Sequence, residues 1–212
     1  MYPKFLQLEQ EKQDRIIQAA IKVFSQKRYK DAGTDEIVKE AGISKGSLFH
    51  YFKNKKDLYH YMYNYAIEVM MEEFYGMIDL SERDFLQRWM QVLTVKLGLL
   101  RRNPYMTNFI KNVYLEEDEV IKLGFELQSQ KLMADAYAKL LEDIDLTLFR
   151  EDIDVQLAIS TIISTLESYA IKQQTLLGFE NIDEEFYEKV MTPLDGYIQL
   201  FKKCFYKGGN EL

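Results

Sequence analysis

Apolar residues recur along most of this chain three and four positions apart, the spacing that places them on one side of an α-helix. The pattern predicts an amphipathic helix over residues 12–26, two short helices over 34–40 and 44–52, and a long helix over about 55–75. Residues 1–11 are expected to be frayed or weakly helical. Further helices are predicted at about 81–102, 103–116, 120–144, 152–177 and 183–207. The sequence therefore predicts an all-α protein of about nine helices.

Two features complicate the helical pattern. Four tyrosines between positions 59 and 65 alternate with other residues, and a period of two taken alone indicates a β-strand. A helix is favoured because Asn54 can cap it and because an apolar row at helical spacing continues through the same segment. Pro193 is expected to kink or interrupt the last helix, since proline lacks the amide donor that a helix interior needs.

The two short helices are joined by a turn that contains glycine. Gly42 suits the end of the first helix because it adopts positive φ at little cost, and Ser44 is a favourable N-cap for the second. Thr34 is expected to cap the first helix. Leu48 and Phe52 fall four apart on the buried side of the second. Such a pair is a helix-turn-helix, and a second helix about 15 Å long fits the major groove of DNA, so the pattern predicts a DNA-binding head.

Residues 34–58, with residues 16–24 ahead of them, closely resemble the tetracycline-repressor (TetR) family of bacterial regulators. The matching elements, in fixed order, are Ala19-Ala20, Phe24 and residues 34–37, 40–44, 45–52 and 53–58. The resemblance covers roughly the first quarter of the chain, and beyond about residue 65 the helical pattern carries no motif. Phe49 departs from the family pattern, in which tyrosine is usual, so this position has no hydroxyl to offer to DNA.

The resemblance implies a helix-turn-helix head over residues 1–57 and a helical ligand-binding and dimerisation domain over residues 58–212, bridged by the fourth helix. It implies a cytoplasmic transcriptional regulator, a repressor, that binds a palindromic operator as a homodimer. A small molecule bound in the C-terminal domain would release it from DNA.

The second short helix supplies most of the predicted DNA contacts. Lys45 suits hydrogen bonds to guanine O6 and N7, Ser47 a base edge or a phosphate, and Phe49 the methyl group of thymine. Tyr51 and Thr34 are expected to contact phosphates, which position the protein without reading sequence. In the family pattern a lysine at position 55 lies against the DNA backbone. The predicted DNA contacts are Thr34, Ser44, Lys45, Gly46, Ser47, Phe49, His50, Tyr51 and Lys55.

The body supplies two further sets of candidate residues. Those for a small-molecule pocket are Trp89, Tyr105, Phe109, Tyr137 and Glu167, although any one of the aromatic residues can equally be core. Glu167 is either a ligand-facing carboxylate or part of a polar rim. The last two helices are apolar on more than one side, and the resemblance implies that they form the dimer interface. Its candidates are Ala158, Ile162, Thr165, Tyr169, Leu194, Tyr197, Ile198, Phe201 and Phe205.

The formal charge of −7 conceals an asymmetry that agrees with a DNA-facing head. Residues 1–60 hold 12 Lys and Arg against 8 Asp and Glu, a balance of +4, and the remainder has 15 against 26, a balance of −11. Local basic charge, not the total, decides phosphate neutralisation. No uncharged apolar stretch is long enough to cross a membrane, no signal peptide is expected, and the single Cys204 fits a reducing cytoplasm.

Catalytic, metal and cofactor motifs are missing from the sequence. There is no glycine-rich phosphate loop, no Gly-x-Ser-x-Gly and no His/Cys cluster, and neither His50 nor His60 belongs to a Glu-x-x-His pair. We therefore expect no enzyme activity, no metal and no cofactor. Two alternatives stay open: a DNA-binding protein of the same fold whose body docks a protein partner and has no small-molecule inducer, and a helical enzyme or scaffold without a DNA role.

Overall fold

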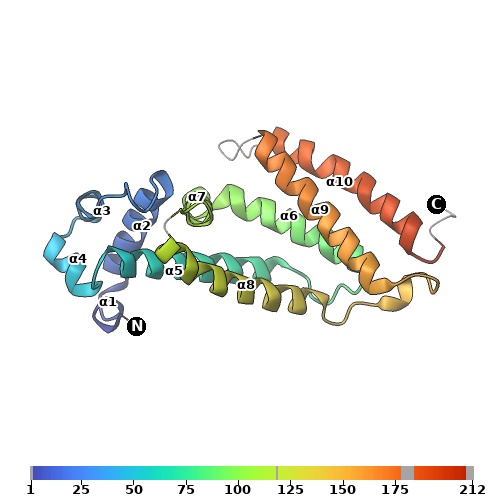
Figure 1. The fold of residues 1–212 in the computed structure, drawn as a ribbon, viewed down its shortest axis with the longest axis horizontal. Coiled ribbons are helices and arrows are strands. Elements are labelled where there is room, and N and C mark those ends of the chain that lie inside the picture. The colour runs from blue at the N-terminus through green and yellow to red at the C-terminus, as the bar shows by residue number, and fades with distance from the viewer. Residues whose placement is uncertain (1, 118, 178–183, 209–212) are drawn as a thin grey trace. The chain divides into compact units, whose positions relative to one another are not determined.

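The computed structural model describes residues 2–117, 119–177 and 184–208, and within these ranges it contains helices and no strand, which confirms the all-α prediction (Figure 1). The only β-type pairing there is an isolated bridge between Phe149 and Tyr206. The elements are α1 (Pro3–Leu6), α2 (Gln10–Gln26), α3 (Thr34–Ala41), α4 (Lys45–Tyr51), α5 (Lys55–Met77), α6 (Phe85–Arg102), α7 (Pro104–Tyr114), α8 (Glu119–Leu141), the 3-10 turn η1 (Leu146–Leu148), α9 (Val155–Leu177) and α10 (Glu184–Phe205).

These elements form two compact units, neither of which is a single stretch of chain. Unit 1 consists of Met1–Tyr75 and Arg102–Ala134, and unit 2 consists of Gly76–Arg101 and Asp135–Leu212. Within the described residues, no helix combines the length and the apolar character that a membrane span requires.

Two helices, α6 and α9, begin a few residues later than predicted, and in each an aspartate caps the first turn. The helix predicted from Ser81 or Glu82 begins at Phe85, because the carboxylate of Asp84 accepts the amide of Leu86 at 2.9 Å. The helix predicted from about residue 152 begins at Val155, where Asp154 accepts the amide of Leu157 at 3.1 Å. Pro193 does not interrupt the last helix, since α10 continues through it.

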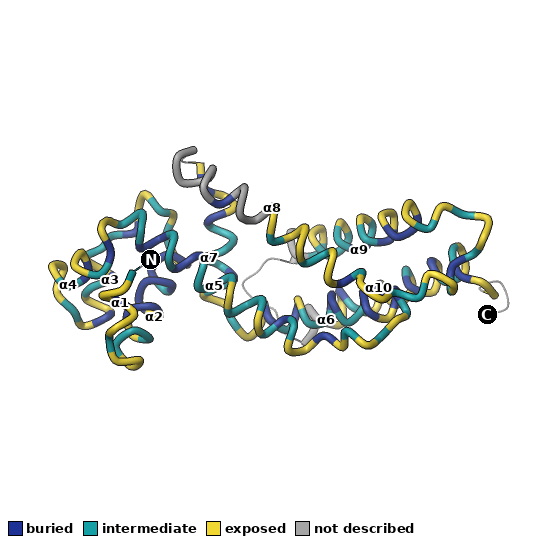
Figure 2. Tube along the Cα trace, turned by 90° about the horizontal axis from the view of Figure 1, so that it is seen from below, coloured by how far each residue is buried: buried dark blue, intermediate teal, exposed yellow. Residues whose placement is uncertain are grey.

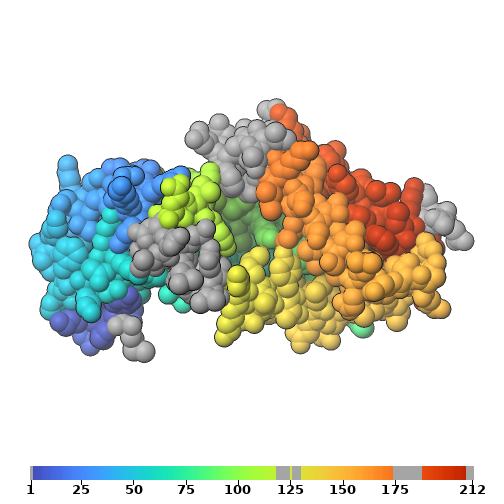
Figure 3. Space-filling view, in the orientation of Figure 1, coloured from blue at the N-terminus to red at the C-terminus, as the bar shows by residue number. Residues whose placement is uncertain are grey.

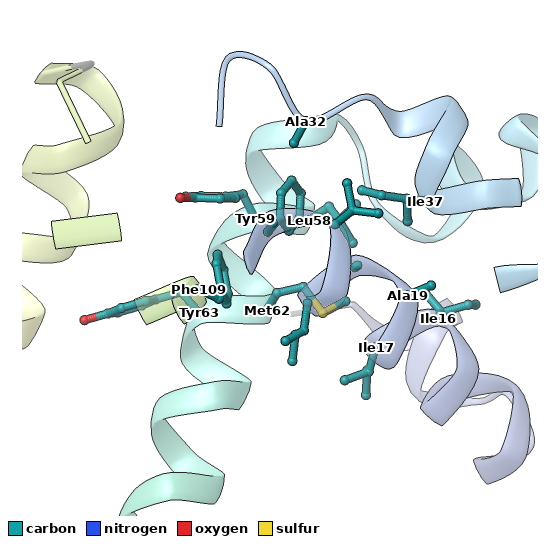
Figure 4. Packing of buried hydrophobic residues seen from close by; sticks show 14 of the residues in the cluster. Ile16, Ile17, Ala19, Ala32, Ile37, Leu58, Tyr59, Met62, Tyr63 and Phe109 are labelled. Carbon is teal, nitrogen blue, oxygen red and sulfur yellow. The ribbon is translucent and has the colours of Figure 1, made fainter. Parts of the chain in front are cut away.

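The core of unit 1 packs α2 and α5 against α7. The Phe24 ring meets the Tyr59 ring edge-on at 4.7 Å and stacks on the Phe109 ring at 5.6 Å, and all three side chains are fully buried. Figure 4 shows Tyr59, Tyr63 and Phe109 side by side in this cluster. The tyrosine-rich run is therefore helical, with two of its rings in the core.

The N-terminal segment, expected to be frayed or weakly helical, forms the short helix α1 and contributes to the same core. Phe5, in α1, is completely buried, and its ring lies 4.9 Å from the Phe52 ring and 5.2 Å from the Tyr61 ring. The hydroxyl of Tyr2 donates to the carbonyl of Asp57 at 3.1 Å. These contacts hold α1 beneath the end of α4, so residues 2–6 form part of the head.

Unit 2 packs α6 with the α9–α10 pair. In Figure 1 and Figure 3, α9 and α10 run side by side. Their facing sides are buried, and Figure 2 shows exposed residues along the opposite sides of both helices. The buried residues of the pair are Ala158, Ile159, Ile162, Leu166, Val190, Leu194, Ile198 and Phe201.

Candidate nucleic-acid interface

Helices α3 and α4 are joined by a glycine turn of the predicted kind. Gly42 has φ 65° and ψ 38°, in the left-handed region that strains a residue with a side chain. Its amide donates to the carbonyl of Lys39 at 3.4 Å, and the amide of Ile43 donates to the carbonyl of Val38 at 3.0 Å. These bonds satisfy carbonyls that the end of α3 leaves open, and they fix the angle at which α4 departs.

Helix α4 has a capped start, a buried side and an open side. The hydroxyl of Ser44 accepts the amide of Ser47 at 3.0 Å, while Leu48 and Phe52 have no exposed surface. The helix has seven residues, so it extends about 10 Å, less than the predicted length. On its solvent side the exposed predicted contacts are Ser44, Lys45, Gly46, Phe49 and His50.

Lys45, the predicted base-reading side chain, is paired with Asp35 of α3. Its ammonium lies 2.9 Å from a carboxylate oxygen, and 52% of the Lys45 side chain and 76% of the Asp35 side chain are exposed. An exposed pair of this kind contributes little to stability, so the lysine can exchange the carboxylate for a DNA acceptor. Sequence reasoning did not identify Asp35 as a competitor.

Lys55 is folded against the loop that follows α2. Its ammonium lies 4.6 Å from the centre of the Tyr29 ring and donates to the carbonyl of Lys30 at 3.4 Å. Burial lowers the pKa of the Lys55 amine, while the carboxylates of Asp31 and Glu116 oppose this change. The charge of Lys55 is therefore held at a defined place on the head.

Thr34 and Tyr51, which were also predicted to contact phosphates, are partly buried. Thr34 is the first residue of α3, whose N-cap is Gly33 without a side-chain bond, so the prediction that Thr34 caps the helix was wrong. The Tyr51 ring lies 6.3 Å from the Phe5 ring, with the ammonium of Lys12 5.7 Å from its centre. Lys12 adds a cation next to α4 that the sequence analysis did not select.

Three of the five candidate pocket residues meet in unit 2. The rings of Trp89 and Tyr137 are stacked with centroids 5.9 Å apart, and the hydroxyl of Tyr137 donates to the carboxylate of Glu167 at 2.7 Å. Lys96, which sequence reasoning missed, places its ammonium 3.4 Å from the same carboxylate oxygen. Burial and the bond to Glu167 both raise the pKa of the Tyr137 hydroxyl. Glu167 is thus joined to an aromatic and a cationic side chain.

The other two candidate pocket residues belong to unit 1. Phe109 is fully buried in the core described above, stacked on Phe24. Tyr105 is 50% exposed at the start of α7. Phe109 acts as core, the alternative that the sequence left open for each aromatic residue.

Most of the predicted dimer-interface residues lie inside the subunit. Ala158, Ile162, Leu194, Ile198 and Phe201 are buried between the helices of unit 2, and so they are not available to a partner. The other four predicted residues, Thr165, Tyr169, Tyr197 and Phe205, are half-buried and also have partners inside the subunit. The Tyr169 ring lies 5.3 Å from the Tyr197 ring, and the Phe205 ring lies 5.9 Å from the Phe201 ring. The hydroxyl of Thr165 donates to the carbonyl of Thr161 at 2.8 Å.

The sides of α9 and α10 that face solvent carry other apolar residues. Leu157 is 65% exposed, Ile171 63% and Leu200 53%. Both sides of these helices are apolar in sequence, so periodicity alone did not show which side packs internally. Elsewhere, the described residues contain no cluster of three or more His, Cys, Asp or Glu side chains able to hold a metal ion.

Comparison with known proteins finds sequence similarity that centres on the head. Residues 16–62 match the model of the bacterial regulatory proteins of the tetR family. The chain is 46% identical over 55 residues to an uncharacterised helix-turn-helix regulator of Bacillus subtilis, YuxN, a match that covers 26% of this chain and 19% of that protein. It is 24% identical over 172 residues to the fatty acid metabolism regulator protein of Bacillus subtilis, covering 78% of this chain and 80% of that one.

The fold as a whole also has counterparts among solved structures. The crystal structure of a putative tetR family transcription regulator from Shewanella sp. PV-4 matches 92% of this chain and 98% of its own with a TM-score of 0.63. The two sequences are 16% identical, so this match concerns the fold. The strong sequence matches thus centre on the helix-turn-helix, and the body is similar in fold.

Proposed function

We propose that the chain is a DNA-binding transcriptional regulator of the TetR family, and that it acts as a homodimeric, cytoplasmic repressor released from a palindromic operator by a small molecule. The observation that carries the proposal is α4: a capped helix with Leu48 and Phe52 buried and a row of side chains, led by Lys45, open to solvent. The charge excess of residues 1–60 supports the same role.

The dimer is proposed to form through the solvent sides of α9 and α10. Leu157, Ile171 and Leu200 expose large apolar side chains there, which is unfavourable in a lone subunit. A two-fold axis would then present two copies of α4 to major grooves about 34 Å apart, and this requires a palindromic operator.

The effector is proposed to bind beside Trp89 in unit 2. The indole N–H of Trp89 is buried and has no acceptor among the described residues, so a ligand with a carbonyl or carboxylate oxygen would satisfy it. The nearby Lys96 and Tyr137 add polar groups. Because the relative that matches along most of the chain is named as a regulator of fatty acid metabolism, fatty acids are the first effectors to test.

Release follows from differential binding. The dimer is proposed to have two states, one whose heads are spaced to fit the operator and one whose heads are not. An effector that binds more tightly to the second state lowers the affinity for operator, at most by the ratio of its affinities for the two states. The residues of unit 2 set ligand affinity, and those of α4 set operator affinity.

Lys45 and Lys55 test the proposed division of roles in the head. Lys45→Ala is expected to weaken operator binding by about 1–3 kcal/mol and to relax specificity at one base pair, because it removes a base contact. Lys55→Ala is expected to weaken binding to every sequence and to flatten the salt dependence, because it removes a phosphate contact. Salt titrations of both variants on operator and on random duplex measure the difference.

The operator for these titrations comes from selection out of a random-sequence DNA pool, with the DNA flanking the coding region as the first candidate. Equal behaviour of the two variants on both DNAs would contradict the assigned roles. Failure of the wild-type chain to bind any duplex would contradict the function itself.

A further inference from the structure

The residues that follow α7 hold the loop between α2 and α3, and all of these segments belong to unit 1. Glu116, two residues beyond the end of α7, is only 6% exposed. One of its carboxylate oxygens accepts the amide of Tyr29 at 3.3 Å, and the other accepts the amide of Glu117 at 3.1 Å. A buried carboxylate is costly without such donors, so these bonds fix where Tyr29 lies.

Two neighbouring side chains act on the same segment. The amide of Asn112 donates to the carbonyls of Phe24 and Ser25, at 2.9 and 3.0 Å, at the last turn of α2. Glu117 pairs with Arg28 at 3.0 Å, but its side chain is 84% exposed, so this pair contributes little. Asn112 thus anchors the last turn of α2, and Glu116 anchors the middle of the loop over residues 27–33, where the Tyr29 ring also lies 5.0 Å from the Tyr59 ring.

This loop in turn supports predicted DNA-backbone contacts. Lys55 rests on the Tyr29 ring and donates to the carbonyl of Lys30, so the position of its ammonium follows the position of the loop. The loop also leads into Thr34, the first residue of α3. If residue 29 shifts, the support beneath Lys55 shifts with it.

We infer that Glu116 is a positioning residue for DNA binding: through its hydrogen bond to the Tyr29 amide it holds the loop on which Lys55 rests. The inference rests on DNA binding by the head and goes beyond it, because Glu116 lies outside the helix-turn-helix. The inference concerns the acceptor oxygen that bonds the Tyr29 amide, and not the negative charge that Glu116 also places near Lys55.

Three single variants separate the hydrogen bond from charge and from general damage. Glu116→Gln removes the charge and keeps one acceptor oxygen at the same reach, enough for the Tyr29 amide but not also for the Glu117 amide. Glu116→Asp keeps the charge but moves the carboxylate away from the Tyr29 amide. Glu117→Gln is the exposed control. Each is titrated with salt on a labelled DNA duplex of random sequence, since the contact concerned is with the backbone. Thermal unfolding of each variant shows whether it is folded at the temperature of the assay.

Glu116→Asp is expected to bind more weakly, and its slope of log affinity against log salt should fall by about 0.9 for each phosphate that the protein no longer neutralises. Glu116→Gln and Glu117→Gln are expected to keep the wild-type slope. Combining Glu116→Asp with Lys55→Ala should reduce the slope no further than Lys55→Ala alone, because both changes act on the same phosphate interaction.

A wild-type slope for Glu116→Asp, a reduced slope for Glu116→Gln, or additive reductions in the double variant would each overturn the inference. In all three cases wild-type binding to the duplex would leave the proposed function standing. Absence of binding by the wild-type chain would instead remove the function on which the inference rests.

Discussion

Lys45 and Asp35 oppose each other across the two short helices of the head, with 2.9 Å between the ammonium and the carboxylate. Both side chains are more than half exposed, and the pair lies on the side of the head that would face DNA. The carboxylate therefore acts twice against binding: it occupies the lysine, and it adds negative charge opposite the phosphates.

Asp35→Asn is accordingly expected to strengthen binding to DNA of any sequence by about 0.5–1 kcal/mol, the scale of an exposed ion pair. The matched control is Glu40→Gln, which removes the same charge from the other end of α3, where Glu40 pairs with Lys22. Fluorescence anisotropy on a random duplex at fixed salt compares the two. An equal gain from both variants would show that net charge, not release of Lys45, is responsible.

Within this head, the sequence allowed the buried side of α4 to be predicted but not the partners of its charged residues. The spacing of Leu48 and Phe52 is a local property, and it is enough to separate the buried side from the open side. The contacts of Lys55 with Tyr29 and Lys30 join positions 25 and more residues apart. Helical periodicity carries no information about such distant pairs.

At the scale of elements, one buried arginine joins three segments of unit 2. Arg88 of α6 is 1% exposed and donates to four carbonyls: Leu80 at 2.7 Å, Glu82 at 2.7 Å, Leu140 at 3.1 Å and Glu142 at 2.6 Å. The last two lie at the end of α8, where the helix leaves carbonyls unpaired and carries partial negative charge. The guanidinium therefore serves as a C-terminal cap for α8 and as a tie to the turn before α6.

Replacing Arg88 with Met is expected to lower the free energy of unfolding by at least about 3 kcal/mol, since several buried carbonyls lose their donors at once. Arg83→Met is the control: its guanidinium is exposed and donates to the carbonyl of Asp143 at 3.1 Å, so a change below about 1 kcal/mol is expected. Urea unfolding followed by circular dichroism measures both. A decrease of similar size in the two variants would contradict the capping role of Arg88.

The elements themselves were predicted to different degrees, for physical reasons. Long amphipathic helices follow from periodicity, and their presence agrees with the structure. Their starts depend on which of several adjacent polar residues forms the cap, and at α6 the residue that does so is Asp84, not Ser81 or Glu82. The short helix α1 falls within the segment expected to be frayed or weakly helical, but its burial was not predicted because Phe5 packs on Phe52 and Tyr61, which are distant in sequence.

At the scale of the whole molecule, the proposed mechanism depends on the apolar residues left exposed on α9 and α10. The residues first predicted for the interface, such as Ile162 and Leu194, are completely buried within the subunit and stabilise it. Leu157 and Ile171 are instead on the open side of α9, fourteen positions apart, which is two heptads along one face. A dimer that buries them gains apolar burial that the isolated subunit lacks.

Leu157→Lys combined with Ile171→Lys is expected to convert the proposed dimer to a monomer. The two added ammonium groups of each subunit would be buried in the interface without partners. The control is Leu146→Lys, which changes an equally apolar residue, 45% exposed, in η1 of the same unit. Sedimentation equilibrium gives the mass of each variant in solution. The monomer should also lose operator affinity steeply, since each head alone keeps only one half-site.

A double-lysine variant that stays dimeric would exclude this side of α9 from the interface. A double-lysine variant that becomes monomeric yet binds operator as tightly as wild type would show that dimerisation does not set the spacing of the heads. In that case the affinity of one α4 helix would have to account for the whole of operator binding. Monomerisation together with weaker operator binding, with the Leu146→Lys control unchanged in both, links the exposed side of α9 to recognition of DNA.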